Sequence, residues 1–239
     1  MALLEIDDVH KRFGNLDALQ GVTFSVTEGE IFGVAGPNGA GKSVLFKTIA
    51  GVHRPDRGDI RLDGDSLVGL SPTKVCHRGL TRTFQTPTTF PSLTVRDNLR
   101  VGTTFGEGGR SVDELLDFLD LGRVADRKAT NLDLFTLKRV VLGAALGAGA
   151  RVLLLDEPMA GFSVVEIEKY RELVHAINDT WGVTIIIIEH LLDVLIGVSD
   201  RLMVLHYGQV LFSGLPEEVR SDETVAEVYL GQAPGAQGA

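Results

Sequence analysis

GPNGAGKS, residues 36–43, is the stretch that decides the fold of this 239-residue chain. It fits the pattern G-x-x-x-x-G-K-[ST], in which glycines let backbone N–H groups converge on phosphate oxygens. The short apolar run IFGVAG precedes it, and SVLFKTIAG follows with helical periodicity and with Gly51 placed to end the helix. Because a strand pattern stands before the loop and a helix pattern after it, the stretch predicts a nucleotide-binding site.

The residues of this loop have separate expected tasks. Lys42 is expected to reach the β- and γ-phosphates of the nucleotide, and the Ser43 hydroxyl is expected to bind Mg²⁺. The helix that begins near Lys42 offers the positive end of its dipole to the phosphates. The residues of this segment that we expect to contact nucleotide are Gly36, Pro37, Asn38, Gly39, Ala40, Gly41, Lys42, Ser43 and Val44.

Two acids follow a buried-strand pattern further along the chain. RVLLLD is apolar on both faces and leads into Asp156 and Glu157, the position where parallel sheets place their chemistry. Asp156 is suited to support Mg²⁺, and Glu157 is suited to orient or deprotonate an attacking water. A second apolar run, TIIIIEH, ends at His190, which we expect at the same sheet edge and near the γ-phosphate. Two adjacent acids favour hydrolysis over phosphoryl transfer to a second substrate.

The order of the remaining segments predicts an α/β fold. Apolar strands alternate with helices such as EIEKYRELVHAIND, which indicates a parallel sheet covered on both sides. LLEIDDV and ALQGVTFSV, near the N-terminus, are strand patterns. We expect one domain over residues 1–239, with a nucleotide-binding core and β-subdomain in 1–85 and 151–230, an inserted helical subdomain in 86–150, and a flexible tail in 231–239.

Composition restricts the function classes. A net charge of −9 and a pI near 5.1 argue against nucleic acid as the main partner. A single cysteine, Cys76, favours a reducing compartment. Acids at positions 5, 7 and 8 interrupt any secretory signal, and the longest apolar run, residues 140–150, is too short to span a membrane, which takes roughly 18 to 20 residues. Any membrane span is therefore expected in another polypeptide.

In chain order, GPNGAGKS, RTFQ, VLLLDEP and IIIIEH resemble the ATP-binding subunit of ATP-binding cassette (ABC) transporters, over nearly the whole chain. The segments FPSLTVRDNL, GLSPTKV, SDRLMVLHYGQVLFSGLPEEV and AEVYLG look most like the bacterial subunits that drive uptake of branched-chain amino acids. The resemblance implies a P-loop NTPase core with a parallel sheet, an N-terminal antiparallel β-subdomain and an inserted helical subdomain. It implies ATP and Mg²⁺ as cofactors.

The resemblance also implies roles for individual residues. Gln85, in RTFQ, would sense the metal and the attacking water and couple to the membrane subunit. Phe13, in KRFG, matches the aromatic residue that stacks on adenine. Glu157 is implied as the general base and His190 as the switch at the γ-phosphate. The implied metal-supporting residues are Ser43, Gln85 and Asp156.

Partners follow from the same resemblance. It implies a dimer with ATP held between the phosphate loop of one subunit and the signature loop of the other, bound to permease subunits at the cytoplasmic face of the inner membrane. We expect a second, different ATPase subunit as the dimer partner, with a homodimer as the alternative. The surface around TPTTFPSLTV is expected to receive a coupling helix of the permease.

Other functions stay open on the sequence alone. The chain could be a nucleotide-binding structural half with little turnover, or the cassette of a different system, such as lipid export or iron–sulfur assembly. A GTPase is disfavoured because the Asn-Lys-x-Asp guanine-reading motif is absent from the sequence. The transported substrate is not readable from this chain.

The signature loop departs from the family pattern Leu-Ser-Gly-Gly-Gln, since residues 132–136 are Leu132, Asp133, Leu134, Phe135 and Thr136. An ionised Asp133 about 4 Å from a phosphate would be repelled by roughly 4 kcal/mol per charge pair at an effective dielectric near 20. Capping its own helix stabilises that helix by about 1 kcal/mol. Asp133 is therefore predicted to cap the helix and to point away from the nucleotide.

The other signature positions offer substitutes for the missing contacts. The backbone N–H groups of Leu134 and Phe135 remain possible donors, although their side chains are expected to crowd the approach. Thr136 offers one hydroxyl in place of the missing serine. In PMAGFS, Ser163 stands where the family has an aspartate that crosses the dimer, so contact between the subunits is expected to be weaker or to rest on backbone groups.

Overall fold

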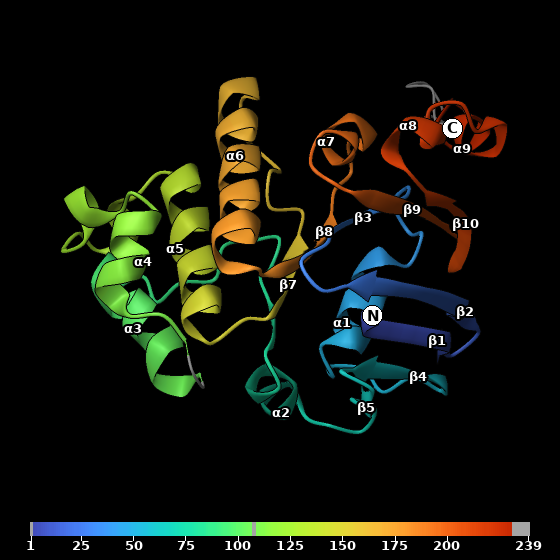
Figure 1. Ribbon diagram of the computed structural model, residues 1–239, viewed down its shortest axis with the longest axis horizontal. Helices are drawn as coiled ribbons and strands as arrows, with labels where there is room; N and C mark the ends of the chain where they lie inside the picture. Colours follow the sequence, from blue (N-terminus) through green and yellow to red (C-terminus); the bar gives the residue numbers. More distant parts are fainter. Residues whose placement is uncertain (1, 107–108, 231–239) are drawn as a thin grey trace.

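Two β-sheets organise the chain, and the nucleotide loop belongs to the larger one (Figure 1). The structure is a computed structural model that describes residues 2–106 and 109–230. The predicted flexible tail, residues 231–239, lies outside the described residues.

The larger sheet has six strands in the order β10–β9–β3–β8–β7–β6. Its strands from β9 to β6 run parallel, and β10 is an antiparallel edge strand. The bounds are β3 (Ile31–Ala35), β6 (Leu80–Arg82), β7 (Val152–Asp156), β8 (Thr184–Ile188), β9 (Arg201–His206) and β10 (Gln209–Gly214).

The central strands bury side chains on both faces. On β7, Leu153 packs into one hydrophobic core and Leu154 into the other. On β8, Ile185 and Ile186 divide in the same way. This double burial explains the unbroken apolar runs in the sequence and confirms the predicted parallel sheet covered on both sides.

The smaller sheet is antiparallel, with strand order β2–β1–β4–β5. Its strands are β1 (Ala2–Phe13), β2 (Leu16–Thr27), β4 (Arg57–Leu62) and β5 (Asp65–Ser66). In the C-terminal part of β2, buried and exposed residues alternate from Val22 to Thr27, as a half-buried strand requires. This sheet confirms the N-terminal antiparallel β-subdomain.

The helices lie around the larger sheet. They are α1 (Lys42–Ile49), α2 (Pro72–His77), α3 (Val95–Phe105), α4 (Val112–Phe118), α5 (Leu134–Gly147), α6 (Val164–Trp181), α7 (Leu192–Ile196), α8 (Pro216–Val219) and α9 (Glu223–Leu230). Figure 1 shows α3, α4 and α5 gathered at one end of the molecule, on the opposite side of the larger sheet from the antiparallel sheet. The division of the chain at residues 85/86 and 150/151 stays a prediction.

Helices α3 and α5 contact each other at glycines. A Cβ added at Gly102 of α3 would collide with the backbone oxygen of Ala144. A Cβ added at Gly143 of α5 would lie 2.5 Å from Cδ2 of Leu99. The two helices therefore approach each other more closely than helices with larger residues at these positions could.

Three strands of the larger sheet are absent from the sequence-based predictions: β6, β9 and β10. Strand β6 has only three residues, too few to show a periodic pattern. Among the described residues, no helix combines the length and the apolar character that crossing a membrane requires.

Candidate nucleotide-binding site

The phosphate loop connects β3 to α1, and two of its glycines are required by its shape. Gly36 and Gly41 have φ values of 146° and 106°, in the region that side-chain-bearing residues avoid. A Cβ at Gly36 would collide with the backbone oxygen of Leu205, and one at Gly41 would lie 2.6 Å from the backbone oxygen of Ala18. The loop can therefore adopt this shape and pack against Ala18 and Leu205 only with glycine at these positions.

Lys42 is the buried cation of this loop. Its Nζ donates to the backbone oxygens of Gly36 and, at 3.1 Å, Pro37. Burial lowers the pKa of Lys42, and the charges of Glu157 and Asp156 act in the opposite direction. The ammonium group is thus held against the backbone of the phosphate loop. It is expected to contact the phosphates from this position.

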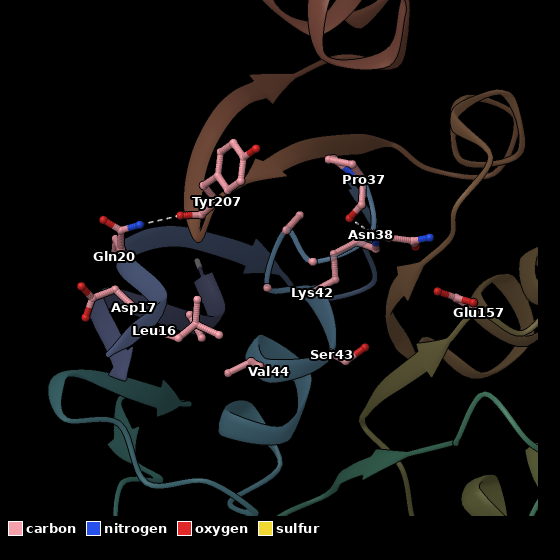
Figure 2. Close-up of a pocket in the computed structure, with 14 residues that line it drawn as sticks. Leu16, Asp17, Gln20, Pro37, Asn38, Lys42, Ser43, Val44, Glu157 and Tyr207 are labelled. Atoms are coloured by element: carbon pink, nitrogen blue, oxygen red, sulfur yellow. Dashed lines mark hydrogen bonds between the residues drawn. The ribbon is translucent and has the colours of Figure 1, made fainter. Parts of the chain in front are cut away.

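A cavity of about 510 Å³ opens beside the loop. In Figure 2, Lys42 and Ser43 lie between Glu157 on one side and Leu16 and Asp17 on the other. The cavity is lined by Leu16, Asp17, Ala18, Gln20, Pro37, Asn38, Gly39, Ala40, Gly41, Lys42, Ser43, Val44, Glu157 and Tyr207. The predicted loop residues line it together, apart from Gly36.

Gln20 on β2 and Tyr207 also line this cavity, and the sequence-based reasoning missed both. Tyr207, in the turn between β9 and β10, is 73% exposed, and its backbone oxygen accepts from Nε2 of Gln20 at 2.6 Å. No sequence signal connects these two residues, because they are 187 positions apart. The fold brings them together at the edge of the sheet.

Phe13, the predicted adenine-stacking residue, is not one of the residues that line the 510 Å³ cavity. It ends β1, is 42% exposed, and packs edge-on against His53 with the ring centroids 5.2 Å apart. Leu16, its cross-strand partner on β2, does line the cavity. Contact between Phe13 and adenine stays a prediction.

Asp156 ends β7 and is engaged by an arginine. Nη2 of Arg82, the last residue of β6, lies 2.7 Å from Oδ2 of Asp156. The two side chains are 8% and 7% exposed. The residue predicted to support the metal is therefore already half of a nearly buried ion pair.

Glu157 is held by its backbone and by its carboxylate. Its φ of 46° lies in the left-handed region, a conformation that costs of order 1 kcal/mol for a non-glycine residue. Its N–H donates to the backbone oxygen of Ile188 at 2.9 Å, and Nε2 of Gln85 donates to its Oε2 at 2.6 Å. The predicted sensor and the predicted base are in direct contact.

His190 lies in a second cavity of about 450 Å³ that shares Asn38 and Glu157 with the first. Gln85 and Glu189 also line this second cavity. The register of β7 and β8 pairs Asp156 with Ile188, which places the polar ends of both strands at one sheet edge, as predicted. The structure thus brings Gln85, Glu157 and His190 together.

Two buried charges lie behind Glu157, and neither was predicted. Nζ of Lys138, on α5, donates to the backbone oxygens of Glu157 at 3.2 Å and Ala160 at 2.8 Å. Oε1 of Glu189 accepts from the N–H of Met159 at 2.7 Å. Burial lowers the pKa of Lys138 and raises the pKa of Glu189 to about 7. The chain segment that carries Glu157 is therefore held from two sides.

The signature position behaves as predicted at Asp133. This residue is the N-cap of α5, and its Oδ1 accepts from the N–H of Thr136 at 2.8 Å. That hydrogen bond is the main cause that lowers the pKa of Asp133. The predicted capping role is confirmed.

The neighbours of Asp133 differ from expectation. The ring of Phe135 turns inward and packs on Phe162 with the centroids 5.1 Å apart, because an apolar aromatic core is available there. The hydroxyl of Thr136 is buried and donates to Oδ2 of Asp133 at 2.9 Å. Thr136 therefore does not present a free hydroxyl in place of the missing serine. The Phe135 ring packs within its own chain, whereas Leu134 is 38% exposed.

Ser163 is likewise engaged within its own chain. It is the N-cap of α6 and forms a capping box with Glu166, whose Oε2 accepts from the Ser163 hydroxyl at 2.6 Å. A capping box satisfies two backbone donors at a helix start. Helix capping thus accounts for the serine at this position.

The residues present fit a magnesium–nucleotide complex. The phosphate loop lines an open cavity of about 510 Å³, and Ser43, Gln85, Asp156 and Glu157 offer the oxygen atoms that Mg²⁺ prefers. A phosphate loop after β3 and two adjacent acids at the end of β7, in one parallel sheet, define a P-loop nucleotide hydrolase.

Comparison with known proteins narrows this class. The family described as "ABC transporter" matches residues 19–160, and the family described as "Branched-chain amino acid ATP-binding cassette transporter" matches residues 209–234. The chain belongs to the ABC transporter family, as one of its ATP-hydrolysing subunits.

Individual relatives cover nearly the whole chain. The high-affinity branched-chain amino acid transport ATP-binding protein BraF of Pseudomonas aeruginosa is 32% identical over 97% of this chain and 98% of its own length. LivG of Salmonella typhimurium, with the same description, is 33% identical over the same shares. The solved ADP conformation of MJ1267, an ATP-binding cassette of an ABC transporter, superposes with a TM-score of 0.88 at 31% identity, covering 97% of this chain and all of that one.

Proposed function

We propose that this chain binds and hydrolyses ATP to energise a membrane importer for branched-chain or related amino acids. The observation that carries the proposal is the position of Glu157, which lines both cavities beside the phosphate loop and contacts Gln85 at 2.6 Å. The relatives named for branched-chain amino acid transport support the substrate class.

In this proposal each residue has one task in hydrolysis. Lys42 and the loop backbone hold the phosphates, and Ser43 and Asp156, with Gln85, hold Mg²⁺, which neutralises phosphate charge when bound. Glu157 accepts a proton from the attacking water, and Gln85 fixes the direction of its carboxylate. His190 lies in the shared cavity, where it can contact the γ-phosphate.

We propose a second, different ATPase subunit as the dimer partner, with a homodimer as the alternative. The support is the state of the signature position, where both Asp133 and Thr136 are engaged in capping α5. A site completed by this chain's signature lacks hydroxyl donors, and removing one preorganised donor typically costs 10² to 10³ in rate. ATP hydrolysis at that site is expected to be slow. The other ATP site of the dimer uses this chain's phosphate loop, and it needs only the signature loop of the partner to be complete.

We also propose that permease subunits dock beside the segment that leads into α3, with the chain peripheral to the membrane on its cytoplasmic face. An apolar cavity of about 340 Å³ lies there, between α2, β6 and α5, and Phe84 and Thr88 line it. Phe84 and Phe90 are 53% and 54% exposed. Exposed aromatic side chains beside an apolar cavity suit a helix that inserts an apolar side chain.

Steady-state ATP hydrolysis by the purified chain, measured across protein concentrations with Lys42→Ala as the blank, tests the proposal. Turnover that rises more steeply than linearly with concentration would show a competent homodimer and would contradict the asymmetric pairing. Nucleotide binding with Lys42-dependent turnover only after the partner subunit is added is the expected result. Binding without turnover in either case would make the chain a structural half.

A further inference from the structure

The ion pair between Arg82 and Asp156 places a positive charge at the predicted metal site. The two groups are 2.7 Å apart, and both are nearly buried. Asp156 lies directly before Glu157 at the end of β7, and the phosphate loop follows β3, two strands away in the sheet. A divalent cation supported by Asp156 must therefore share that carboxylate with a guanidinium group.

The surroundings of Arg82 would allow its side chain to leave the Asp156 carboxylate. Within the described part of the chain, its Nε is buried and has no hydrogen-bond partner. Its guanidinium carbon lies 5.1 Å from the ring centroid of Phe84, so an aromatic face stands beside the cation on the side of the 340 Å³ cavity that both residues line. Arg82 is thus held by one carboxylate and one exposed ring.

We propose that Arg82 is a positioning residue that occupies Asp156 in the metal-free state and competes with Mg²⁺ for it, an inference that rests on the proposed function of the site. The pair keeps the buried carboxylate neutralised before the metal arrives, since a buried unpaired charge is strongly destabilising. When Mg²⁺ binds, Arg82 gives up Asp156 and keeps its contact with the Phe84 ring. Because Phe84 is exposed in the cavity proposed for the permease, a partner segment there contacts the group that controls the metal carboxylate.

The affinity of the chain for the non-hydrolysable analogue AMP-PNP, measured by calorimetry at a series of free Mg²⁺ concentrations, tests this inference without turnover. Arg82→Gln keeps a hydrogen-bond donor for Asp156 but removes the charge. It is expected to lower the Mg²⁺ concentration for half-maximal enhancement of binding by about tenfold or more (~1.4 kcal/mol), because the guanidinium charge no longer opposes the divalent ion.

Three controls give the result its meaning. Arg82→Lys keeps the charge and is expected to restore the wild-type Mg²⁺ dependence. Arg78→Met, which removes an exposed arginine paired with Asp65, is expected to change nothing. AMP-PNP affinity in the absence of Mg²⁺ is expected to be unchanged in Arg82→Gln, because Arg82 does not line the 510 Å³ cavity.

An unchanged or a raised Mg²⁺ requirement in Arg82→Gln would overturn the inference, since a raised value would mean that Arg82 only orients Asp156 for the metal. If Arg82→Gln does not fold, ¹⁵N spectra of the arginine Nε–H groups in the wild-type chain decide instead. The Arg82 resonance, assigned by its loss in Arg82→Lys, must move when Mg²⁺ is added to the AMP-PNP complex, and a fixed resonance would refute the competition. A wild-type chain that fails to bind AMP-PNP would overturn the proposed function itself.

Discussion

Gln85 donates its side-chain amide to the carboxylate of Glu157 over 2.6 Å. Gln85 follows β6 and precedes the loop that leads into α3, whereas Glu157 follows β7. One hydrogen bond therefore connects the proposed base to the segment beside the proposed permease cavity. A displacement of that segment would change the direction of the carboxylate before it changed any contact to the phosphate loop.

Gln85→Ala is expected to uncouple transport more than it weakens ATP binding. The substitution frees the Glu157 carboxylate but leaves the phosphate loop intact, so ATP affinity should change by less than about threefold while transport falls by about tenfold or more. Nucleotide titration of the purified chain and substrate uptake by vesicles carrying the assembled transporter measure the two quantities. Equal losses in both would refute the coupling role of Gln85.

Lys138→Met is expected to slow hydrolysis with little change in ATP affinity. The variant keeps the apolar stem but removes the two hydrogen bonds from Lys138 to the backbone oxygens of Glu157 and Ala160. Loss of these buried contacts should also lower the free energy of unfolding by about 1 to 3 kcal/mol. Turnover and nucleotide affinity are compared with Lys169→Met, which alters an exposed lysine of α6. A rate equal to that control would show that α5 does not position the base.

Glu189→Gln is expected to remove a pH dependence of stability. Burial raises the pKa of Glu189 from 4.5 to about 7, so the folded state holds its proton more tightly than the unfolded state does. Wild-type stability relative to the variant should therefore fall as pH rises from about 4.5 to about 7, by about 3 kcal/mol in all, and stay level above that. Denaturant unfolding of both proteins at pH 5 and pH 8 measures the difference. Parallel pH profiles would contradict the assignment.

Asp133→Ala is expected to destabilise the chain by about 1 kcal/mol, because it removes the side chain that caps α5. Asp133→Ser retains a capping oxygen and should lose less than half as much. It also removes the negative charge, so ATP turnover at a site completed by this signature should rise. Unfolding free energies and hydrolysis rates of both variants check the pair. A neutral Asp133→Ala would show that the cap contributes nothing.

Local chemistry explains which parts of the fold and site could be predicted. The phosphate loop, the β7 and β8 strands and the Asp133 cap are each marked by a pattern of a few consecutive residues, which appears directly in the letters. The residues that the prediction missed act over long separations. Arg82 reaches Asp156 across 74 positions and Lys138 reaches Glu157 across 19.

Lys138 is the clearest example of a site residue that sequence-based prediction could not find. A lysine in a helix is ordinarily a solvent-exposed residue, and nothing in LDLFTLKR indicates that its ammonium group is buried against backbone oxygens of another segment. The inward turn of Phe135 has the same origin, since Phe162 and Tyr170, which form its surroundings, come from later in the chain. Only the three-dimensional arrangement of α5, α6 and the β7 loop determines both.

The glycine contact between α3 and α5 makes these two helices one mechanical body. Gly102 lies against the backbone of Ala144, so no side chain at this point can change rotamer to let one helix slide past the other. The two helices are therefore expected to move together. The unit carries the segment proposed to face the permease, at the start of α3, and the Asp133 loop, at the start of α5. A displacement of the start of α3 is therefore expected to move the start of α5 as well.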